Sequence, residues 1–152
     1  MTAFVTAGAG FLLAVLWFDL MFDVQCLPDL RGEGELPEDV LASIAGYYRR
    51  VTTKARPMNR LIAAVMVATI AAIVAQVARG DHPRWVGWAS LALAAAAIGL
   101  AAARTVPGAV RLGARSDAAI VQSRLARSIC RDHLACLAAI ASLVTIQLAF
   151  AT

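Results

Sequence analysis

The sequence is poor in charge, and its charged residues are unevenly placed. Charged residues make up 16% of the 152 residues and hydrophobic residues 61%, against about 25% and about 45–50% in ordinary soluble domains. Lysine occurs once, as Lys54, and the arginines flank long apolar runs instead of forming a patch among aromatic residues. The net charge of +4 therefore does not indicate a protein that binds nucleic acid.

Motifs that identify a reaction are also missing. The sequence has no glycine-rich phosphate loop, no strained serine turn of the hydrolase type and no zinc-protease helix. Catalytic residues are therefore unknown at this stage, and any enzymatic function would depend on side chains of common types.

What the sequence does contain is four apolar runs that approach the roughly 20 residues needed to cross a bilayer. They cover residues 3–26, 58–78, 85–103 and 134–150. The longer connections between them are the polar segments 27–57 and 104–133, while 79–84 is a short turn. We therefore predict one all-α domain over residues 1–152, an integral membrane four-helix bundle.

The positive charges predict its orientation. Twelve of the 14 lie in or beside segments 27–57 and 104–133, and only Arg79 and Arg84 lie in the short turn. The positive-inside rule places the two basic segments in the cytosol and both termini outside. No Lys or Arg precedes the first run, and Asp19 and Asp23 interrupt it, so we expect it to be retained as a membrane span. The expected location is the cell (inner) membrane, as a multi-pass protein.

The first cytosolic segment contains the pattern of an amphipathic helix. Pro37 is followed by two acids, and basic residues lie near the other end, up to Lys54. The residues that recur on one helical face between them are Val40, Ile44, Tyr47, Tyr48 and Val51. This order suits a helix dipole and predicts a helix from Pro37 to Lys54. Two interpretations remain open: the helix lies along the inner membrane surface, or it caps the bundle.

The second cytosolic segment predicts a break and then a long helix. Pro107, Gly108 and Gly113 are expected to break the chain after the third span. Ser116 with Asp117 is expected to begin a fourth helix that starts outside the membrane and runs unbroken to the end of its span. A basic stripe lies on the protruding part of this helix. It is expected to face solvent or lipid headgroups, or to bind an anionic substrate; it consists of Arg124, Arg127 and Arg131.

Ionisable and potential metal-binding side chains are expected to converge at the cytosolic ends of the spans. Asp19 and Asp23 are four residues apart, so they share a helical face. We expect Arg60 and Arg104 to be their partners, with Asn59 or His133 as hydrogen-bonding neighbours. The aspartates either form a salt bridge that holds helices together or bind a ligand, a proton or a metal. The candidate ligand-binding residues are Asp19, Asp23, Asn59, Arg60, Arg104, Asp132 and His133.

A metal ion is a candidate cofactor at the same place. Soft thiolate ligands favour copper or zinc, but Cys130 and Cys136 lie six positions apart and do not face together on one helix. The alternative is three buried, reduced cysteines, all on the cytosolic side, where a structural disulfide is not expected. Since His82 lies in the outer turn, haem ligation by two histidines of one chain is excluded. The candidate metal ligands are Asp19, Asp23, Cys26, Cys130, His133 and Cys136.

Three functional hypotheses follow. The first is a protein that handles an ion or small molecule at a cytosol-facing intramembrane site. The second is an accessory or assembly subunit of a larger membrane complex, in which the polar cluster is structural. The third is an enzyme acting on a lipid-soluble substrate with an aspartate or His133 as general base. The expected partners are the lipid bilayer and either a second copy of the chain or another membrane subunit. Small residues such as Gly99 and Ala103 allow helices to pack tightly and permit homo-oligomers. Gln76 and Gln147 predict interhelical hydrogen bonds.

Overall fold

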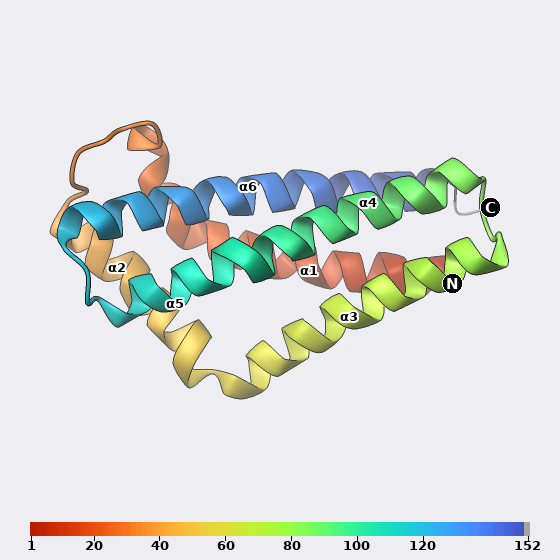
Figure 1. Cartoon of the computed structure of the whole chain (residues 1–152), viewed down its shortest axis with the longest axis horizontal. Helices are drawn as coiled ribbons and strands as arrows, with labels where there is room; N and C mark the ends of the chain where they lie inside the picture. Colours follow the sequence, from red (N-terminus) through yellow and green to blue (C-terminus); the bar gives the residue numbers. More distant parts are fainter. Residues whose placement is uncertain (151–152) are drawn as a thin grey trace.

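The computed structural model describes residues 1–150, apart from the side chain of Arg56. Within this range the chain is helical and has no strands (Figure 1). The elements are α1 (Thr2–Asp23), η1 (Val24–Asp29), α2 (Glu38–Tyr48), η2 (Arg49–Lys54), α3 (Arg56–Arg79), α4 (Arg84–Leu100), η3 (Ala101–Thr105), α5 (Val106–Ala114) and α6 (Ala119–Ala149).

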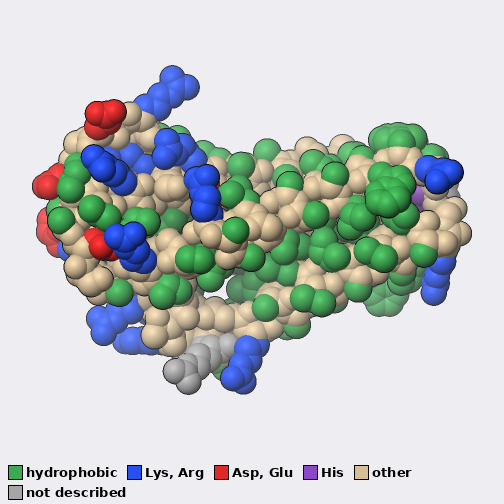
Figure 2. Space-filling model, viewed as in Figure 1, with side chains coloured by type: hydrophobic (Ala, Val, Ile, Leu, Met, Phe, Trp, Pro, Cys, Tyr) green, Lys and Arg blue, Asp and Glu red, His purple; other side chains and the backbone are tan. Residues whose placement is uncertain are grey.

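Four of the helical stretches are long and apolar enough to cross a membrane, which confirms the predicted all-α, multi-pass architecture. They are Thr2–Asp29, Pro57–Arg79, Arg84–Ala114 and Ala119–Ala149. Figure 2 shows charged side chains gathered at the two ends of the molecule and an apolar band between them. We call the end that carries α2 and the 115–118 turn the inner end. The opposite end, with the 80–83 turn and both chain termini (Figure 1), is the outer end.

The predicted break at Pro107 is wrong. Helix α4 continues through η3 into α5, so the chain is helical from Arg84 to Ala114. A proline inside a helix lacks an N–H group and its ring clashes with the carbonyl four residues earlier. The π-helical turn η3 lies immediately before α5, and such a turn rearranges the hydrogen bonds that the proline would disrupt. The helix instead ends at Ala114, where Arg115 adopts a left-handed conformation with φ of 55°.

The apolar interior has two parts, one in the bundle and one at the inner end. In the bundle, α1, α3, α4 and α6 bury side chains such as Leu12, Ile73 and Leu143. At the inner end, α2 packs its apolar face against α5 and α6, burying Ile44 and Leu112. The helix itself runs from Glu38 to Tyr48 and continues as the π-helical η2.

The fourth helix is continuous, as predicted. Helix α6 has 31 residues, from Ala119 to Ala149, so it reaches from the inner-end core through the bundle. Figure 1 shows α6, α4 and α1 running along one another, while α3 spreads away from α4 and α5 toward its Arg56 end. The long α6 therefore carries residues of both polar ends of the molecule.

Candidate functional site

Five polar side chains meet at the inner end, and we call them the Asp–His–Tyr cluster. Helix α1 supplies Asp19 and Asp23, α2 supplies Tyr47 and Tyr48, and α6 supplies His133. The four-residue spacing places both aspartates on one side of α1, and the short α2 crosses close enough for both hydroxyls to reach them. The cluster thus joins three helices that are far apart in sequence.

The imidazole ring of His133 lies between the two carboxylates. Its Nδ1 is 2.6 Å from Oδ2 of Asp23, which is hydrogen-bonding distance, whereas its Nε2 is 3.7 Å from Oδ2 of Asp19. Asp23 is completely buried, while the Asp19 side chain keeps 17% of its surface exposed. The two sides of the ring are therefore unequal: one contact is short and closed, and the other is longer and partly accessible.

Each carboxylate also accepts a hydrogen bond from one tyrosine. The hydroxyl of Tyr47 donates to Oδ1 of Asp19 and that of Tyr48 to Oδ1 of Asp23, both at 2.6 Å. Burial, and then the neighbouring carboxylates, raise the pKa of each tyrosine hydroxyl well above its usual range. Both tyrosines therefore remain neutral donors. Their spacing in the sequence predicts only that they lie on an apolar helical face. They are the only two tyrosines in the sequence, and both meet the aspartates.

The expected arginine partners of Asp19 and Asp23 lie elsewhere. Arg104 donates to Asp132 at 2.8 Å and also to Ser128, and Thr105 lies 3.5 Å from the second Asp132 oxygen. Adjacent residues of a helix point about 100° apart, so Asp132 faces α4 and η3 while the next residue, His133, faces α1. The structure thus separates the predicted ligand set into two neighbouring clusters.

The two remaining members of that set do not join either cluster. Arg60 is exposed, and the ion pairs found among the described residues do not include it. The amide of Asn59 donates to the backbone carbonyl of Thr52 at 3.0 Å, and so fixes the turn between η2 and α3. Asn59 therefore has a structural contact, and Arg60 faces the surroundings.

The predicted basic stripe on α6 is not a uniform surface feature. Arg124 and Arg131 are exposed, but only 2% of the Arg127 side chain is accessible. Arg127 donates to the backbone carbonyls of Asp29 and Gly34 at 2.8 and 2.9 Å and also pairs with the Asp29 carboxylate. This arginine is therefore an internal clamp that fixes the loop between η1 and α2 on α6.

The candidate metal ligands do not converge. Cys26 and Cys130 are buried in the inner-end core, whereas Cys136 belongs to the bundle core and donates its S–H to the Ala97 carbonyl. Residues 1–150 contain no group of three or more His, Cys, Asp or Glu side chains arranged to hold a metal ion. Both ring nitrogens of His133 face carboxylates, so neither is directed at a shared metal position.

A second polar network occupies the outer end. The amides of Gln76 and Gln147 exchange hydrogen bonds at 2.9 and 3.2 Å, which confirms the predicted interhelical contacts. Gln147 also donates to Ser90, and Gln76 donates to Thr2. The Thr2 hydroxyl in turn lies 2.9 Å from Nε2 of His82. This network links all four spans at the end opposite to the Asp–His–Tyr cluster.

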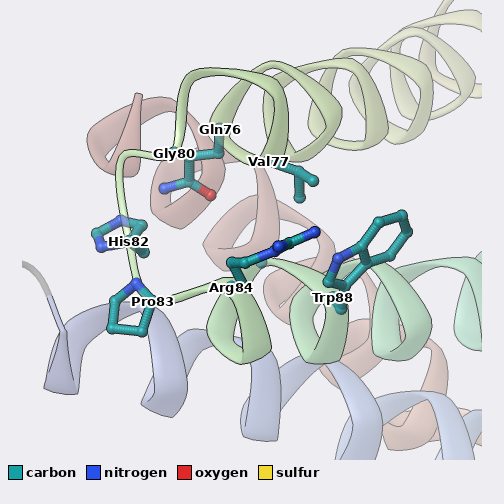
Figure 3. A pocket seen from close by; sticks show the side chains of 8 residues that line it. Gln76, Val77, Gly80, His82, Pro83, Arg84 and Trp88 are labelled. Atoms are coloured by element: carbon teal, nitrogen blue, oxygen red, sulfur yellow. The ribbon is translucent and has the colours of Figure 1, made fainter.

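The outer network borders a small pocket of about 90 Å³. Figure 3 shows Gln76 and His82 on one side of it and the Arg84 side chain extending toward Trp88 on the other. The two amides already satisfy each other, and the pocket holds only a few water-sized volumes. We regard this end as a structural tie between helices.

Between the two polar ends the bundle is apolar. Its interior there is filled by residues such as Leu12, Ile73, Ala94, Ile140 and Leu143. The Thr69 hydroxyl in this layer donates to the Val65 carbonyl of its own helix, whereas the buried Thr6 hydroxyl has no partner among the described residues.

Comparison of the chain with known protein families, with characterised proteins and with solved structures finds no match.

Proposed function

We propose that the Asp–His–Tyr cluster binds and releases a proton on the cytosolic side of the membrane. The observation that carries this proposal is the unequal bridge across His133. A neutral imidazole has one N–H, and the 2.6 Å contact with Asp23 assigns it to Nδ1. The lone pair of Nε2 then faces Oδ2 of Asp19 at 3.7 Å. A proton placed on either of these two atoms would draw them together into a hydrogen bond.

A proton suits this site better than a larger ligand because all its polar atoms except Nε2 of His133 and Oδ2 of Asp19 already satisfy one another. Both oxygens of Asp23 have partners, and each tyrosine hydroxyl donates to a carboxylate. The buried side-chain atoms without partners in the described structure lie elsewhere, on Thr6, Arg115 and Gln122. A proton can enter a closed set of hydrogen bonds without displacing any side chain.

Charged and titratable groups surround the exchange position on every packed element. Asp23 lies on α1, the two tyrosines on α2, and Asp132, already paired with Arg104, lies beside His133 on α6. With both aspartates ionised, the cluster carries a net charge of −2 when the ring is neutral, with one N–H, and −1 when it is the imidazolium, with two. Because a buried net charge is costly, proton uptake by this cluster is favoured as the pH falls.

The exchange position faces one side of the membrane. Asp19 is the more accessible carboxylate, and it lies at the inner end, which the positive-inside rule assigns to the cytosol. The apolar layer of the bundle separates it from the outer network. Protons would therefore enter and leave the cluster from the same side.

The proposal is tested by ¹⁵N NMR of histidine in the full chain, reconstituted in lipid nanodiscs. His82 is the only other histidine, so His82→Gln leaves one labelled ring. We expect the Nε2 signal of His133 to change as the pH is scanned from about 5 to about 9, a range that includes the ordinary histidine pKa, and Asp19→Asn, which removes the carboxylate facing Nε2, to alter that change. A ring that keeps one protonation state over this range would show that the cluster only ties the helices together, as in the accessory-subunit hypothesis.

A further inference from the structure

An apolar groove lies between α1 and α3 on the side of the bundle. It has a volume of about 660 Å³, and its walls include Phe11 of α1 and Leu61 and Val65 of α3. The two helices approach closely at its floor, because a Cβ added to Gly8 would overlap the Thr69 hydroxyl. That hydroxyl is already bonded to the Val65 carbonyl of its own helix. The groove therefore offers chiefly apolar contacts, which suit a hydrocarbon chain.

The groove is about as long as one leaflet of a bilayer is deep. On α3 its lining runs from Leu61 to Ala72, which is about 16 Å along the helix axis. Half of a typical hydrocarbon core is about 15 Å. The acyl chain of a phospholipid would therefore lie along the groove, with the headgroup at one end of it.

Arg60 lies at the inner end of this groove. It directly precedes Leu61, and it lies eleven residues before Ala71, which also lines the groove. Eleven residues make about three full turns of an α-helix, so Arg60 and Ala71 lie on nearly the same side of α3. Side chains of a helix tilt toward its N-terminus, and this tilt directs the long Arg60 side chain toward the membrane surface at the inner end. Arg60 therefore lies where the headgroup of a lipid in the groove would be.

The charge around Arg60 is positive. The sequence has no Asp or Glu in residues 1–18, which include the α1 wall, or in residues 40–80, which include η2 and α3. Arg60 is exposed, as are Arg50 and Lys54 of η2. Figure 2 shows basic side chains bordering the apolar band at the inner end, with acidic ones nearer the tip. This end of the groove therefore complements an anionic headgroup.

The opposite end of α3 is less suited to a headgroup. Its arginine, Arg79, lies seven residues beyond Ala72, the last α3 residue of the lining, which is about 10 Å along the axis. Arg60, in contrast, is the immediate neighbour of Leu61. The headgroup therefore fits the inner end, which the positive-inside rule assigns to the cytosol.

We infer that the groove between α1 and α3 binds an anionic phospholipid of the cytosolic leaflet, with one acyl chain along the groove and the phosphate at Arg60. A zwitterionic phospholipid has the same chains but no net charge, so it gains less from the basic residues of η2 and α3. The inference goes beyond the proposed function and does not depend on it, because neither Arg60 nor the groove residues belong to the Asp–His–Tyr cluster. Lipid binding decides the one, and titration of His133 decides the other.

Native mass spectrometry of the full chain in nonionic detergent tests the inference, because it counts the lipids bound to each chain. The probes are dioleoyl phosphatidylglycerol, which is anionic, and dioleoyl phosphatidylcholine, which has the same chains and no net charge. We expect one phosphatidylglycerol per chain at saturation, bound more tightly than phosphatidylcholine. Equal affinities for the two lipids, or a chain that forms dimers and takes up no lipid, would overturn the inference.

Arg60→Gln tests the headgroup contact at an exposed position, where the substitution leaves the core intact. It should weaken binding of phosphatidylglycerol about fivefold and leave that of phosphatidylcholine unchanged, since a basic residue near an anionic lipid contributes about 1 kcal/mol. Arg79→Gln, at the other end of α3, and Arg131→Gln, exposed on α6, remove the same charge away from the inner end of the groove. Both controls should bind phosphatidylglycerol as the wild type does. An equal effect of all three substitutions would show that the lipid responds only to net charge, and the inference would be wrong.

A second pair of variants tests the groove independently of the charge. Ala68 lines the groove, so Ala68→Phe should fill it and weaken binding of phosphatidylglycerol. Ala63 is exposed elsewhere on α3, and Ala63→Phe is the matched control that should bind normally. Equal binding by the two variants would show that the acyl chain does not lie in the groove, which contradicts the inference.

Discussion

Replacing Asp23 by asparagine tests the central contact of the Asp–His–Tyr cluster. The asparagine side chain has the same shape, but it offers one acceptor oxygen and one NH₂ group where the carboxylate accepts from two donors. In the wild type these donors are the Tyr48 hydroxyl and Nδ1 of His133, both at 2.6 Å. Asp23 is completely buried, so water cannot replace a lost partner.

The expected change in stability follows from the two hydrogen bonds. A hydrogen bond to a charged group contributes about 1.5–3 kcal/mol, against about 0.5–1.5 kcal/mol for a neutral one. Converting both contacts of Asp23 to neutral ones therefore lowers the free energy of unfolding by about 2 kcal/mol. Asp19→Asn is the matched control: Asp19 is partly exposed and has one short hydrogen bond, from Tyr47, so we expect a loss of about 1 kcal/mol or less.

The Asp23→Asn substitution should also reverse the histidine tautomer. When the oxygen of the introduced amide accepts from Tyr48, the NH₂ group of that amide faces Nδ1 of His133, which must then act as acceptor. The ring proton moves to Nε2 and points toward Asp19.

Two measurements check this prediction. Reversible unfolding by dodecyl sulfate in mixed micelles gives the free-energy difference, and ¹⁵N NMR of the histidine ring gives the tautomer. Equal losses of stability in Asp23→Asn and Asp19→Asn, or an unchanged tautomer in Asp23→Asn, would refute the assigned hydrogen-bond geometry.

Three further predictions concern the inner end. Gly113→Ala should destabilise the protein by about 1–3 kcal/mol in the same unfolding assay, since its Cβ would lie 2.8 Å from the Arg49 backbone nitrogen; Gly99→Ala, with open space around it, should not. Arg127→Ala should lower the free energy of unfolding by about 3 kcal/mol, because it removes charge-assisted hydrogen bonds to two backbone carbonyls. It should also expose the loop between η1 and α2 to protease, and equal cleavage of Arg124→Ala would contradict this. Burial raises the pKa of the Tyr47 and Tyr48 hydroxyls above its ordinary value. The contribution of the neutral hydroxyls to the free energy of unfolding is therefore complete below about pH 10, the ordinary tyrosine pKa, and is lost as the pH rises above it. Ultraviolet titration should therefore detect tyrosinate only together with unfolding, and ionisation of the folded protein near pH 10 would show that the hydroxyls are not held as described.

The membrane architecture was predictable because a bilayer imposes a length on every span. About 20 apolar residues are needed for each crossing, and four runs of about this length are visible in the sequence alone. The same argument placed Asp19, Asp23 and His133 at one end of the bundle, since odd and even spans run in opposite directions. Depth in the membrane is therefore encoded in position along the chain.

The partners within the site were predictable only in part: His133 was expected beside the aspartates, but Tyr47 and Tyr48 were not. Pairing Asp19 and Asp23 with Arg104 matched their depth but not the rotation of the helices, and a single helical step separates Asp132 from His133. That rotation depends on how α1, α4 and α6 pack together. Likewise, the rule that a proline ends a helix describes an isolated helix. In this chain the π-helical turn η3, just before Pro107, accommodates the proline inside a packed span.

The separation of the two polar ends limits what the bundle can do with a proton. A relay across the membrane would need hydrogen-bonding groups at mid-depth. There the Thr69 hydroxyl and the Cys136 thiol are bonded to backbone carbonyls, and the Thr6 hydroxyl has no partner within residues 1–150; the side chains packed around them are apolar. A proton that enters at Asp19 would therefore leave by the same route. Coupling of the cluster to another event then requires something that changes the balance of charge at Asp19 itself.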